Sequence, residues 1–411
     1  MKASIAILLP APLTSQNLAR TGTVILSEHF QVFIIDCSRW VYPNSTAQVD
    51  KVEWESLTEI DSLDGLRNFL TSTRIDFAID FIGDLPIRNQ IARTLSDFNS
   101  YLVIQKLGQI PRKIRLTLRI REITTKSINL LQARKGKGAL SPSTISKRRT
   151  VSLPTVGFID RLKKIVLDPV TLRRSNPYVV LQTGDRSSTW MSILARRVIR
   201  IASNDYHTFT SNQAESKKMA LTNRSFVLFI DDCLIEALDW QILGVQPPIN
   251  KEKYFAALNS FFDKLEERLK MQIIIAGHPN TSGNNAYDAN FRHRKVVYSQ
   301  TSKLTQDSSL VLLHASTAAS FAVLAEKPLV TLTSDEISHT LIGRQVRAVS
   351  HALGTKMVNI DHVDDEIEIP KINKRKYRNY KNHFVKGDRV QEMGQLQNFI
   401  DAVPKMLKRN D

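Results

Sequence analysis

An acidic pair closes one of the most apolar runs in this sequence. Asp231 and Asp232 directly follow the run Phe226–Ile230. A carboxylate at the end of a buried strand is held rigidly in partly dry surroundings, so it can act as a nucleophile or as a general base. The pair also fits a helix N-cap, because Glu236 stands near the capping-box position. The residues alone leave both roles open, one for each aspartate.

A histidine and a proline follow a second apolar run. Gly277, His278 and Pro279 come after Gln272–Ala276. An imidazole at a strand end can donate a hydrogen bond to a phosphate or base oxygen. The proline fixes the backbone and prevents the chain from continuing the strand. A purely structural turn histidine is an equally good interpretation of the same residues.

Two hydroxyl residues follow a third apolar run. His314, Ala315, Ser316 and Thr317 come after the strand expected over 309–313, where a helix is expected to begin. Free N–H groups at a helix start, together with two hydroxyls, can bind an anion without a metal. Ser316 also suits a simple helix cap, and the two roles are compatible.

Three further groups are candidates for a ligand site. Asp205 and His207 follow the strand expected over 198–201. Arg292 and Arg294 belong to a basic cluster that could bind a phosphate or a carboxylate, although a solvated surface loop explains it too. The acidic stretch 361–365 looks metal-like, but we expect a solvated turn there.

Several familiar site signatures are missing from the sequence. No Gly-x-Gly-x-x-Gly follows the first expected strand and no P-loop occurs, which disfavours dinucleotide oxidoreductases and Walker-type NTPases. No His-Glu-x-x-His motif or strand-end Asp-x-Asp motif occurs, so we expect no metal. With only two cysteines, the chain has neither a disulfide scaffold nor a four-cysteine zinc site.

The composition is that of a globular protein with a strong positive charge. The 411 residues include 57 Lys and Arg against 40 Asp and Glu, a formal net charge of +17. Such a charge favours an anionic partner, namely a nucleic acid, a membrane surface or a phosphorylated substrate. Aromatic residues make up only 7%, which disfavours single-strand nucleic-acid binding by base stacking.

The apolar runs alternate with helical patterns along most of the chain. This alternation predicts an α/β protein with parallel sheets covered on both faces. We expect two Rossmann-like domains facing across a cleft, over residues 1–215 and 216–370, and a basic helical tail over 371–411. Open sheets of this kind bind ligands at the carboxyl ends of their strands, where the motifs above are found.

One segment within the first domain is unusually basic. Residues 112–150 hold twelve Lys or Arg and one acid, Glu122, so they supply +11 of the net charge. The segment could be a solvated charged face or a site for nucleic acid. It could also dock on anionic lipid headgroups or on a lipid diphosphate.

The order and spacing of the motifs over residues 200–335 resemble those of bacterial surface-polysaccharide glycosyltransferases of the GT-B type that use CMP-activated acidic sugars. The chain is most similar to the KpsC-like Kdo (3-deoxy-manno-octulosonate) transferases, and among these to the retaining β-Kdo transferase domains of the WbbB type. The resemblance implies a GT-B fold, CMP-β-Kdo as donor and no cofactor or metal.

The resemblance also assigns roles to the motif residues. It implies that His278 and Pro279 contact the CMP group and that Ser316 and Thr317 hold its phosphate. Asp232, favoured over Asp231, would attack the anomeric carbon and form a sugar–enzyme ester. The acceptor would then displace the ester with net retention. Arg292 and Arg294 would bind the donor carboxylate or phosphate, and Asp205 and His207 would be further residues of the cleft.

The implied acceptor is a lipid-linked or oligosaccharide glycan of an O-antigen or a capsule. The implied location is the cytoplasm, peripherally at the inner face of the bacterial cytoplasmic membrane, on an anionic membrane surface and without nucleic acid. An inverting CMP-sialic acid transferase is an alternative, although Cys233 stands where those enzymes often carry glycine. A second alternative is a non-catalytic basic protein that binds nucleic acid or membranes.

Overall fold

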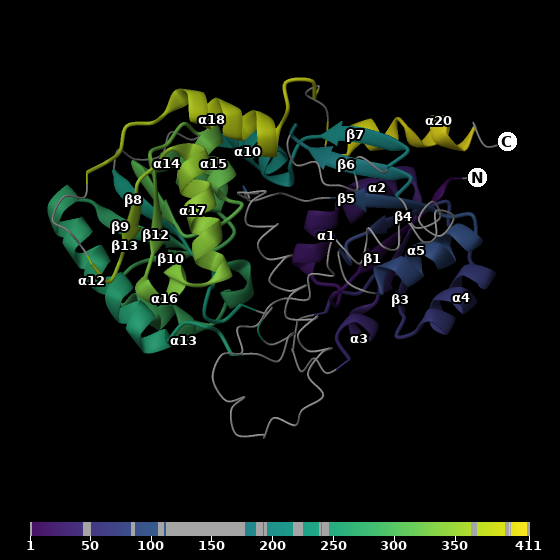
Figure 1. Cartoon of the computed structure of the whole chain (residues 1–411), viewed down its shortest axis with the longest axis horizontal. Helices are drawn as coiled ribbons and strands as arrows, with labels where there is room; N and C mark the ends of the chain where they lie inside the picture. Colours follow the sequence, from purple (N-terminus) through teal and green to yellow (C-terminus); the bar gives the residue numbers. More distant parts are fainter. Residues whose placement is uncertain are drawn as a thin grey trace, which may run out of the picture.

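The chain folds into two α/β units that lie side by side (Figure 1). The computed structural model describes residues 2–43, 51–83, 87–105, 111, 177–185, 192, 195–216, 225–237, 240, 246–362, 368–390, 394 and 396–408. The basic segment 112–150 lies outside the described residues, so its docking on anionic lipid stays a prediction.

The first unit contains a parallel sheet of seven strands. Their order across the sheet is β3-β2-β1-β4-β5-β6-β7. The strands are β1 (Ser4–Leu9), β2 (Gln31–Asp36), β3 (Leu57–Glu59), β4 (Phe77–Asp80), β5 (Tyr101–Gln105), β6 (Val179–Thr183) and β7 (Arg197–Ile201). All six residues of β1 are buried, as expected for a central strand covered on both faces.

Helices cover the two faces of this sheet. They are α1 (Ser15–Thr21), α2 (Thr23–His29), α3 (Ser38–Val41), α4 (Leu63–Ser72) and α5 (Arg88–Asp97). Leu26 of α2 packs in the core on one face, and Leu66 of α4 and Leu95 of α5 pack in the core on the other. Leu66 and Leu70 of α4, and Ile91 and Leu95 of α5, recur at a helical spacing of four residues, so each of these two helices buries one side.

The second unit contains a parallel sheet of six strands. Their order is β10-β9-β8-β11-β12-β13. The strands are β8 (Phe226–Ile230), β9 (Gln272–Ala276), β10 (Val296–Val297), β11 (Leu310–Leu313), β12 (Leu329–Thr333) and β13 (Met357–Asn359). β8 pairs with β9 on one side and with β11 on the other, so the ends of these three strands meet at one edge of the sheet.

Helices also cover both faces of the second sheet. The larger elements are α10 (Asn204–Ser216), α12 (Lys251–Leu269), α14 (Thr301–Asp307), α15 (Ala319–Leu324) and α17 (Leu341–Leu353). The shorter ones are η2 (Pro279–Thr281), α13 (Asn285–Asp288), η3 (Ala289–Phe291) and α16 (Asp335–Ser338). Phe262 of α12 packs on one face, and Ala322 of α15 and Val349 of α17 pack on the other. α10 follows β7 of the first sheet in sequence but packs against α14 and α15.

The C-terminal segment joins both units. It contains α18 (Lys374–Tyr380), η4 (Lys381–Val385), α19 (Gln397–Ile400) and α20 (Val403–Leu407). Tyr377 and Tyr380 of α18 belong to a core cluster of the second sheet. Phe399 and Met406, in contrast, are fully buried in a core cluster of the first sheet. The segment therefore crosses from one unit back to the other (Figure 1).

η4 touches the first sheet at the end of β6. The N–H of Asp185 donates to the carbonyl of Asn382 at 2.8 Å, and the N–H of Ser203 donates to that of Val385 at 2.8 Å. Gly184 lies between these contacts with a φ of 63°. A Cβ at Gly184 would lie 2.4 Å from the backbone oxygen of His383. The crossing therefore requires glycine for two reasons, its left-handed conformation and its lack of a side chain.

We expect Gly184→Ala to destabilise the protein. The left-handed φ alone costs about 1–2 kcal/mol for alanine, and the contact with the His383 backbone adds to that cost. Gly83 offers a matched control, because its φ is 76° and a Cβ there meets nothing within 4 Å. Chemical denaturation of both variants should show the larger loss of unfolding free energy for Gly184→Ala; equal losses would contradict the close contact.

Candidate functional site

The site is built where three neighbouring strands end. β9, β8 and β11 are adjacent and parallel, so their carboxyl ends point the same way. The chain leaves β8 at Asp231 and Asp232, leaves β9 toward His278, and leaves β11 at His314. The strand pairing thus gathers three motifs that lie more than 80 residues apart in sequence at their extremes.

Asp231 is buried and anchored from several sides. Its Oδ1 accepts the N–H of Cys233 at 3.0 Å, and its Oδ2 accepts the hydroxyl of Tyr287 at 2.9 Å. The backbone N–H of His278 also donates to this carboxylate. Burial nevertheless raises the pKa of Asp231 to about 6, because these donors only partly replace water. Asp231 therefore connects the end of β8 to the turn after β9.

Cys233 adopts a conformation that favours glycine. Its φ is 50°, and its side chain is completely buried. A left-handed backbone is unusual for a residue with a Cβ. The hydrogen bond from the Cys233 N–H to Asp231 holds the turn in this shape. The residue therefore follows the backbone path that a glycine after the acidic pair would take.

Asp232 is less completely paired than Asp231. Its Oδ2 accepts the N–H of Ala315 at 2.7 Å, whereas its Oδ1 is shielded from water without a hydrogen-bond partner. Burial raises the pKa of Asp232 to about 7; the Ala315 N–H opposes this shift and the charge of Asp231 adds to it. The Ser316 hydroxyl also favours the ionised form. Asp232 is thus a buried carboxylate with one oxygen that has no hydrogen-bond partner.

The turn after β11 contacts this carboxylate through backbone and side chain. The Oγ of Ser316 accepts the N–H of Ala318 at 3.2 Å, a bond within the turn. Thr317 is exposed, and its carbonyl accepts the hydroxyl of Ser320 at 2.7 Å. The N-cap of α15 is Ala318, without a side-chain capping bond, so Ser316 is not the helix cap that the sequence suggested. Its hydroxyl lies beside Asp232.

His278 has a defined protonation pattern. Its Nδ1 accepts the N–H of Asn280 at 3.2 Å, so the neutral ring carries its proton on Nε2. This bond caps η2, in which Pro279 is the first residue. Pro279 is exposed, and His278 is half-buried. The ring can therefore offer Nε2–H as a hydrogen-bond donor.

His314 supports the site from below, a role that its motif did not reveal. The ring is fully buried, with Nδ1 2.9 Å from the carbonyl of Leu332 and Nε2 2.8 Å from the hydroxyl of Tyr254. A carbonyl can only accept, so Nδ1 donates and Nε2 accepts from Tyr254. Burial lowers the pKa of His314 to about 4, which keeps the ring neutral. This pairing fixes the backbone just before Ala315. In the sequence, only Tyr254 on α12 could indicate this role of His314, and its proximity to His314 is evident only in the fold.

Asp205 and His207 lie on α10, next to α15 rather than at a strand end. The carboxylate of Asp205 accepts the hydroxyl of Ser320, which also contacts the Thr317 carbonyl. Burial raises the pKa of Asp205 to about 6 and lowers that of the half-buried His207. Asp205 is therefore one hydrogen bond away from the turn after β11, whereas no described contact links His207 to it.

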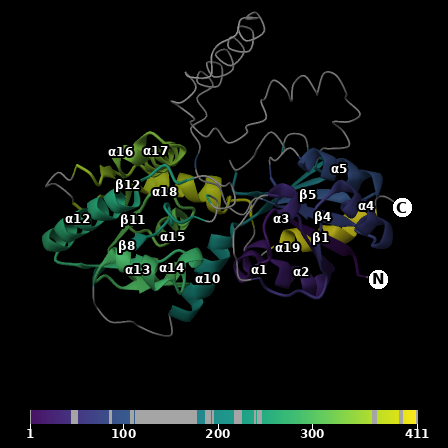
Figure 2. The same cartoon turned by 90° about the horizontal axis from the view of Figure 1, so that it is seen from below.

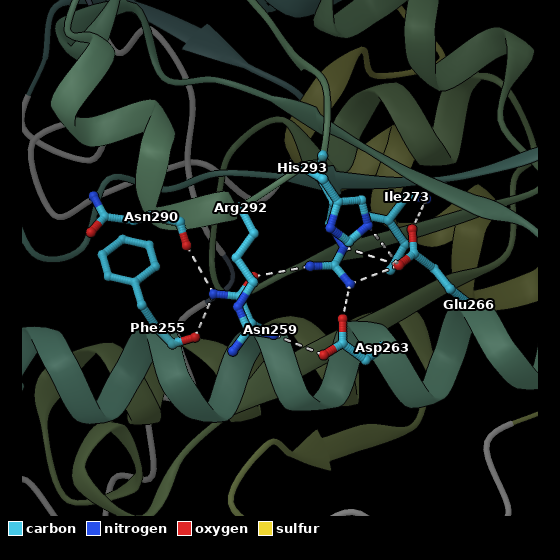
Figure 3. A network of polar contacts seen from close by, with 9 residues as sticks. Phe255, Asn259, Asp263, Glu266, Ile273, Asn290, Arg292 and His293 are labelled. Atoms are coloured by element: carbon cyan, nitrogen blue, oxygen red, sulfur yellow. Dashed lines mark hydrogen bonds and ion pairs between the residues drawn. The ribbon is translucent and has the colours of Figure 1, made fainter.

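Arg292 and Arg294 have a structural role, which corrects the expectation that they bind the donor. The Arg294 side chain is fully buried, contacts Asp263, donates from Nη2 to Glu266 at 2.7 Å and from Nη1 to Asn259 at 3.0 Å. Arg292 pairs with Asp263 at 2.9 Å. Both guanidinium groups thus bind α12. Figure 3 shows Arg292 beside Asp263 of this helix. Their charge is neutralised by carboxylates, so we do not include them in the site.

The described residues contain neither a cluster suited to a metal ion nor a helix suited to cross a membrane. Within the ranges given above, no group of three or more His, Cys, Asp or Glu side chains is arranged to hold a metal ion. Asp361 and His362 of the metal-like stretch are exposed, and His362 pairs with Asp335 at 2.9 Å. In the same part of the chain, none of the helices combines the length and the apolar character needed to cross a bilayer.

Comparisons with known proteins identify the fold. Neither the protein families nor the curated proteins that were compared give a match. Among solved structures, the wall teichoic acid polymerase TagF matches 100% of this chain and 90% of its own, with a TM-score of 0.50 at 11% identity. MurG from Acinetobacter baumannii matches 98% of this chain and 100% of its own (TM-score 0.46, 8% identity).

A UDP-GlcNAc 2-epimerase from Methanocaldococcus jannaschii, in complex with UDP-GlcNAc and UDP, matches 92% of this chain and 98% of its own (TM-score 0.45, 11% identity). Sequence identities this low support a similarity of fold and nothing about function. The expected α/β architecture of two Rossmann-like domains is confirmed by the two parallel sheets, and its GT-B type by the match to TagF.

The raised pKa of Asp232 predicts a pH-dependent stability. The pKa is about 7 in the folded chain against 3.8 for a free side chain, so the folded state binds the proton more tightly. Stability from this group is full below the unfolded pKa and is lost as the pH rises through the folded pKa. Asp232→Asn removes the ionisable group but keeps an acceptor for Ala315.

We therefore expect Asp232→Asn to match the wild-type stability near pH 4 and to exceed it at about pH 8 by roughly 1–4 kcal/mol. Thermal unfolding across this pH range measures the difference. Asp61→Asn, at an exposed carboxylate, is the control and should show no such trend. A constant difference between wild type and Asp232→Asn would contradict the buried, poorly paired carboxyl.

Proposed function

We propose that this chain is a retaining glycosyltransferase that moves Kdo from CMP-β-Kdo to a surface-polysaccharide acceptor of the O-antigen or capsule type. The observation that carries the proposal is the position of Asp232. Its carboxylate bonds the backbone of the turn after β11 at 2.7 Å, and its neighbour Asp231 accepts the N–H of His278 after β9. Asp231 and Asp232 are thus hydrogen-bonded to the two turns that hold the donor-binding residues implied by the resemblance, namely His278 and Ser316.

The donor would lie across these strand ends. In this proposal Ser316 and Thr317 hold the phosphate with their hydroxyls, and His278 donates from Nε2 to the CMP group. The proposal requires no metal, because CMP is a comparatively good leaving group. The epimerase described above is in complex with UDP-GlcNAc and UDP, and TagF is a wall teichoic acid polymerase; neither specifies the donor of this chain.

The reaction proceeds in two displacements. A carboxylate oxygen of Asp232 forms a bond to the anomeric carbon while the bond to the CMP phosphate breaks and CMP takes the electron pair. The acceptor hydroxyl then forms its bond to the same carbon, loses its proton and releases the Asp232 carboxylate. Two inversions give net retention. The nucleophile must be ionised, so a pKa near 7 makes the step sensitive to pH.

An inverting CMP-sialic acid transferase remains as the second candidate, and one observation favours it. Those enzymes often carry glycine after the acidic pair, and Cys233 adopts a glycine-like φ of 50°. Cys233 therefore differs from the glycine of those enzymes in its side chain but not in its left-handed backbone conformation. In this alternative the same carboxylate would only deprotonate the acceptor. A basic protein without catalysis would give no response to any of the nucleotides tested below.

The donor class is tested by thermal-shift measurements with CMP, UDP, GDP and ADP. We expect CMP alone to raise the unfolding temperature, because binding to the folded state stabilises it by mass action. Ser316→Ala and His278→Ala should reduce that shift, whereas Thr71→Ala, on the distant α4, should leave it unchanged. Stabilisation by a uridine nucleotide instead of CMP would overturn the assignment of the donor.

The role of Asp232 is tested by turnover and by mass spectrometry. We expect Asp232→Ala to lose transfer by at least about a thousandfold while CMP still stabilises the protein, because the nucleophile is lost and the nucleotide site is kept. Intact-mass measurement of wild type mixed with CMP-Kdo should show one added Kdo on Asp232. In wild type, kcat/KM should rise with pH through about 7, as the carboxyl ionises.

Two outcomes would contradict this assignment. Near-normal turnover by Asp232→Ala would exclude it as nucleophile. Asp231→Ala distinguishes the two acids: it should weaken transfer through a disturbed turn, but leave the Kdo adduct detectable on Asp232. A product with inverted anomeric configuration by NMR would favour the sialyltransferase-like alternative.

A further inference from the structure

α17 carries a basic stripe along its outer face. Arg344, Arg347 and His351 are exposed at helical spacings of three and four residues, and the exposed Leu341 begins the same stripe. The opposite side of the helix is buried in the cores of the second sheet. The outer face therefore consists of cationic side chains beside one large apolar residue.

α18 presents a second stripe of the same kind. Lys374, Arg375 and Arg378 are exposed, and the exposed Lys381 follows at the start of η4. Tyr377 and Tyr380 fill the inner side of the helix, and the Tyr377 hydroxyl donates to the carbonyl of Lys327 at 2.9 Å. The inner side of α18 is thus packed against the core, and its outer side carries exposed basic side chains.

The two stripes form one surface. α17 and α18 pack together, and the ammonium of Lys376 donates to the carbonyl of His351 at 2.9 Å, at the C-terminal end of α17. The views from two directions place α17 and α18 next to each other on the second unit (Figures 1 and 2). We call this surface, formed by the outer sides of α17 and α18 and by Lys381, the α17–α18 face.

The α17–α18 face lacks compensating charge. Neither helix contains Asp or Glu. Among the residues that the structure describes, Arg344, Arg375, Arg378 and Lys381 form no ion pair. Elsewhere on the same unit exposed cations do pair, as Lys251 does with Glu236 at 2.7 Å and Arg292 with Asp263 at 2.9 Å. Neither α17 nor α18 therefore supplies an acid that would compensate these four cations.

We propose that the α17–α18 face docks the protein on an anionic lipid bilayer. Lys and Arg side chains near a membrane surface are attracted by anionic headgroups. Long basic side chains can lay their stems along the interface while Leu341, 45% exposed, inserts its apolar end. The proposal concerns a surface apart from the donor motifs, so it holds whichever sugar the chain transfers.

The test is sedimentation of the full chain with vesicles. One set contains phosphatidylcholine alone and the other equal parts of phosphatidylcholine and phosphatidylglycerol. The variant combines Arg344→Gln, Arg375→Gln, Arg378→Gln and Lys381→Gln, and leaves Arg347 and Lys376 in place because both donate to backbone carbonyls. The control combines Lys253→Gln, Lys264→Gln, Arg268→Gln and Lys270→Gln, four exposed cations of α12.

We expect wild type to bind the anionic vesicles only, and less tightly as salt rises. The α17–α18 variant should lose on the order of tenfold or more in affinity, and the α12 control much less. Thermal unfolding and the response to CMP should be unchanged in both variants, which separates this test from that of the proposed function.

Three results would overturn the proposal. The first is wild type that fails to bind anionic vesicles or binds neutral ones equally well. The second is an α17–α18 variant that binds as wild type does, which would leave attachment to the basic segment 112–150. The third is a variant that loses salt-sensitive binding to duplex DNA but keeps vesicle binding, which would make the face a nucleic-acid surface.

Discussion

The parallel pairing of β8 with β9 and β11 is the constraint on which the site depends. It brings three strand ends to one edge and places the acidic pair where a sheet covered on both faces gives way to turns. Water is excluded there, so both carboxyls have raised pKa values. Both oxygens of Asp231 accept a hydrogen bond, whereas Oδ1 of Asp232 has no hydrogen-bond partner. Two adjacent identical residues therefore differ in how completely their carboxylates are paired.

Supporting groups keep the strand ends in place from the side of α12. Tyr254 holds His314 below the turn after β11, and Arg294 fastens the segment after α13 to the outer side of α12. α13 also carries Tyr287, which bonds Asp231. One helix therefore braces both turns that flank the acidic pair. These contacts hold the site residues in place although they lie on loops, which are usually the most variable parts of a fold.

Sequence patterns sufficed for the alternation of strands and helices, because short runs of Ile, Val, Leu and Phe between helical patterns are typical of buried strands in a parallel sheet. They also sufficed for the meeting of the acidic pair with His278 and Ser316, which follows once the strands are parallel and adjacent. They failed for Arg294, because its partners Asp263 and Glu266 lie on a helix some 30 residues earlier and look like solvent-exposed charges. His314 was missed as a supporting residue for the same reason: Tyr254 is 60 residues away.

The C-terminal segment, which crosses from the second unit to the first, affects the order in which the chain folds during synthesis. Phe399, Val403 and Met406 fill part of the core of the first sheet, although β1 to β7 end at Ile201. During synthesis the strands of the first sheet emerge long before these side chains exist. The first unit must therefore wait, with an unfilled apolar face, until the entire second sheet has left the ribosome. The final packing of the first sheet is therefore a late step in folding.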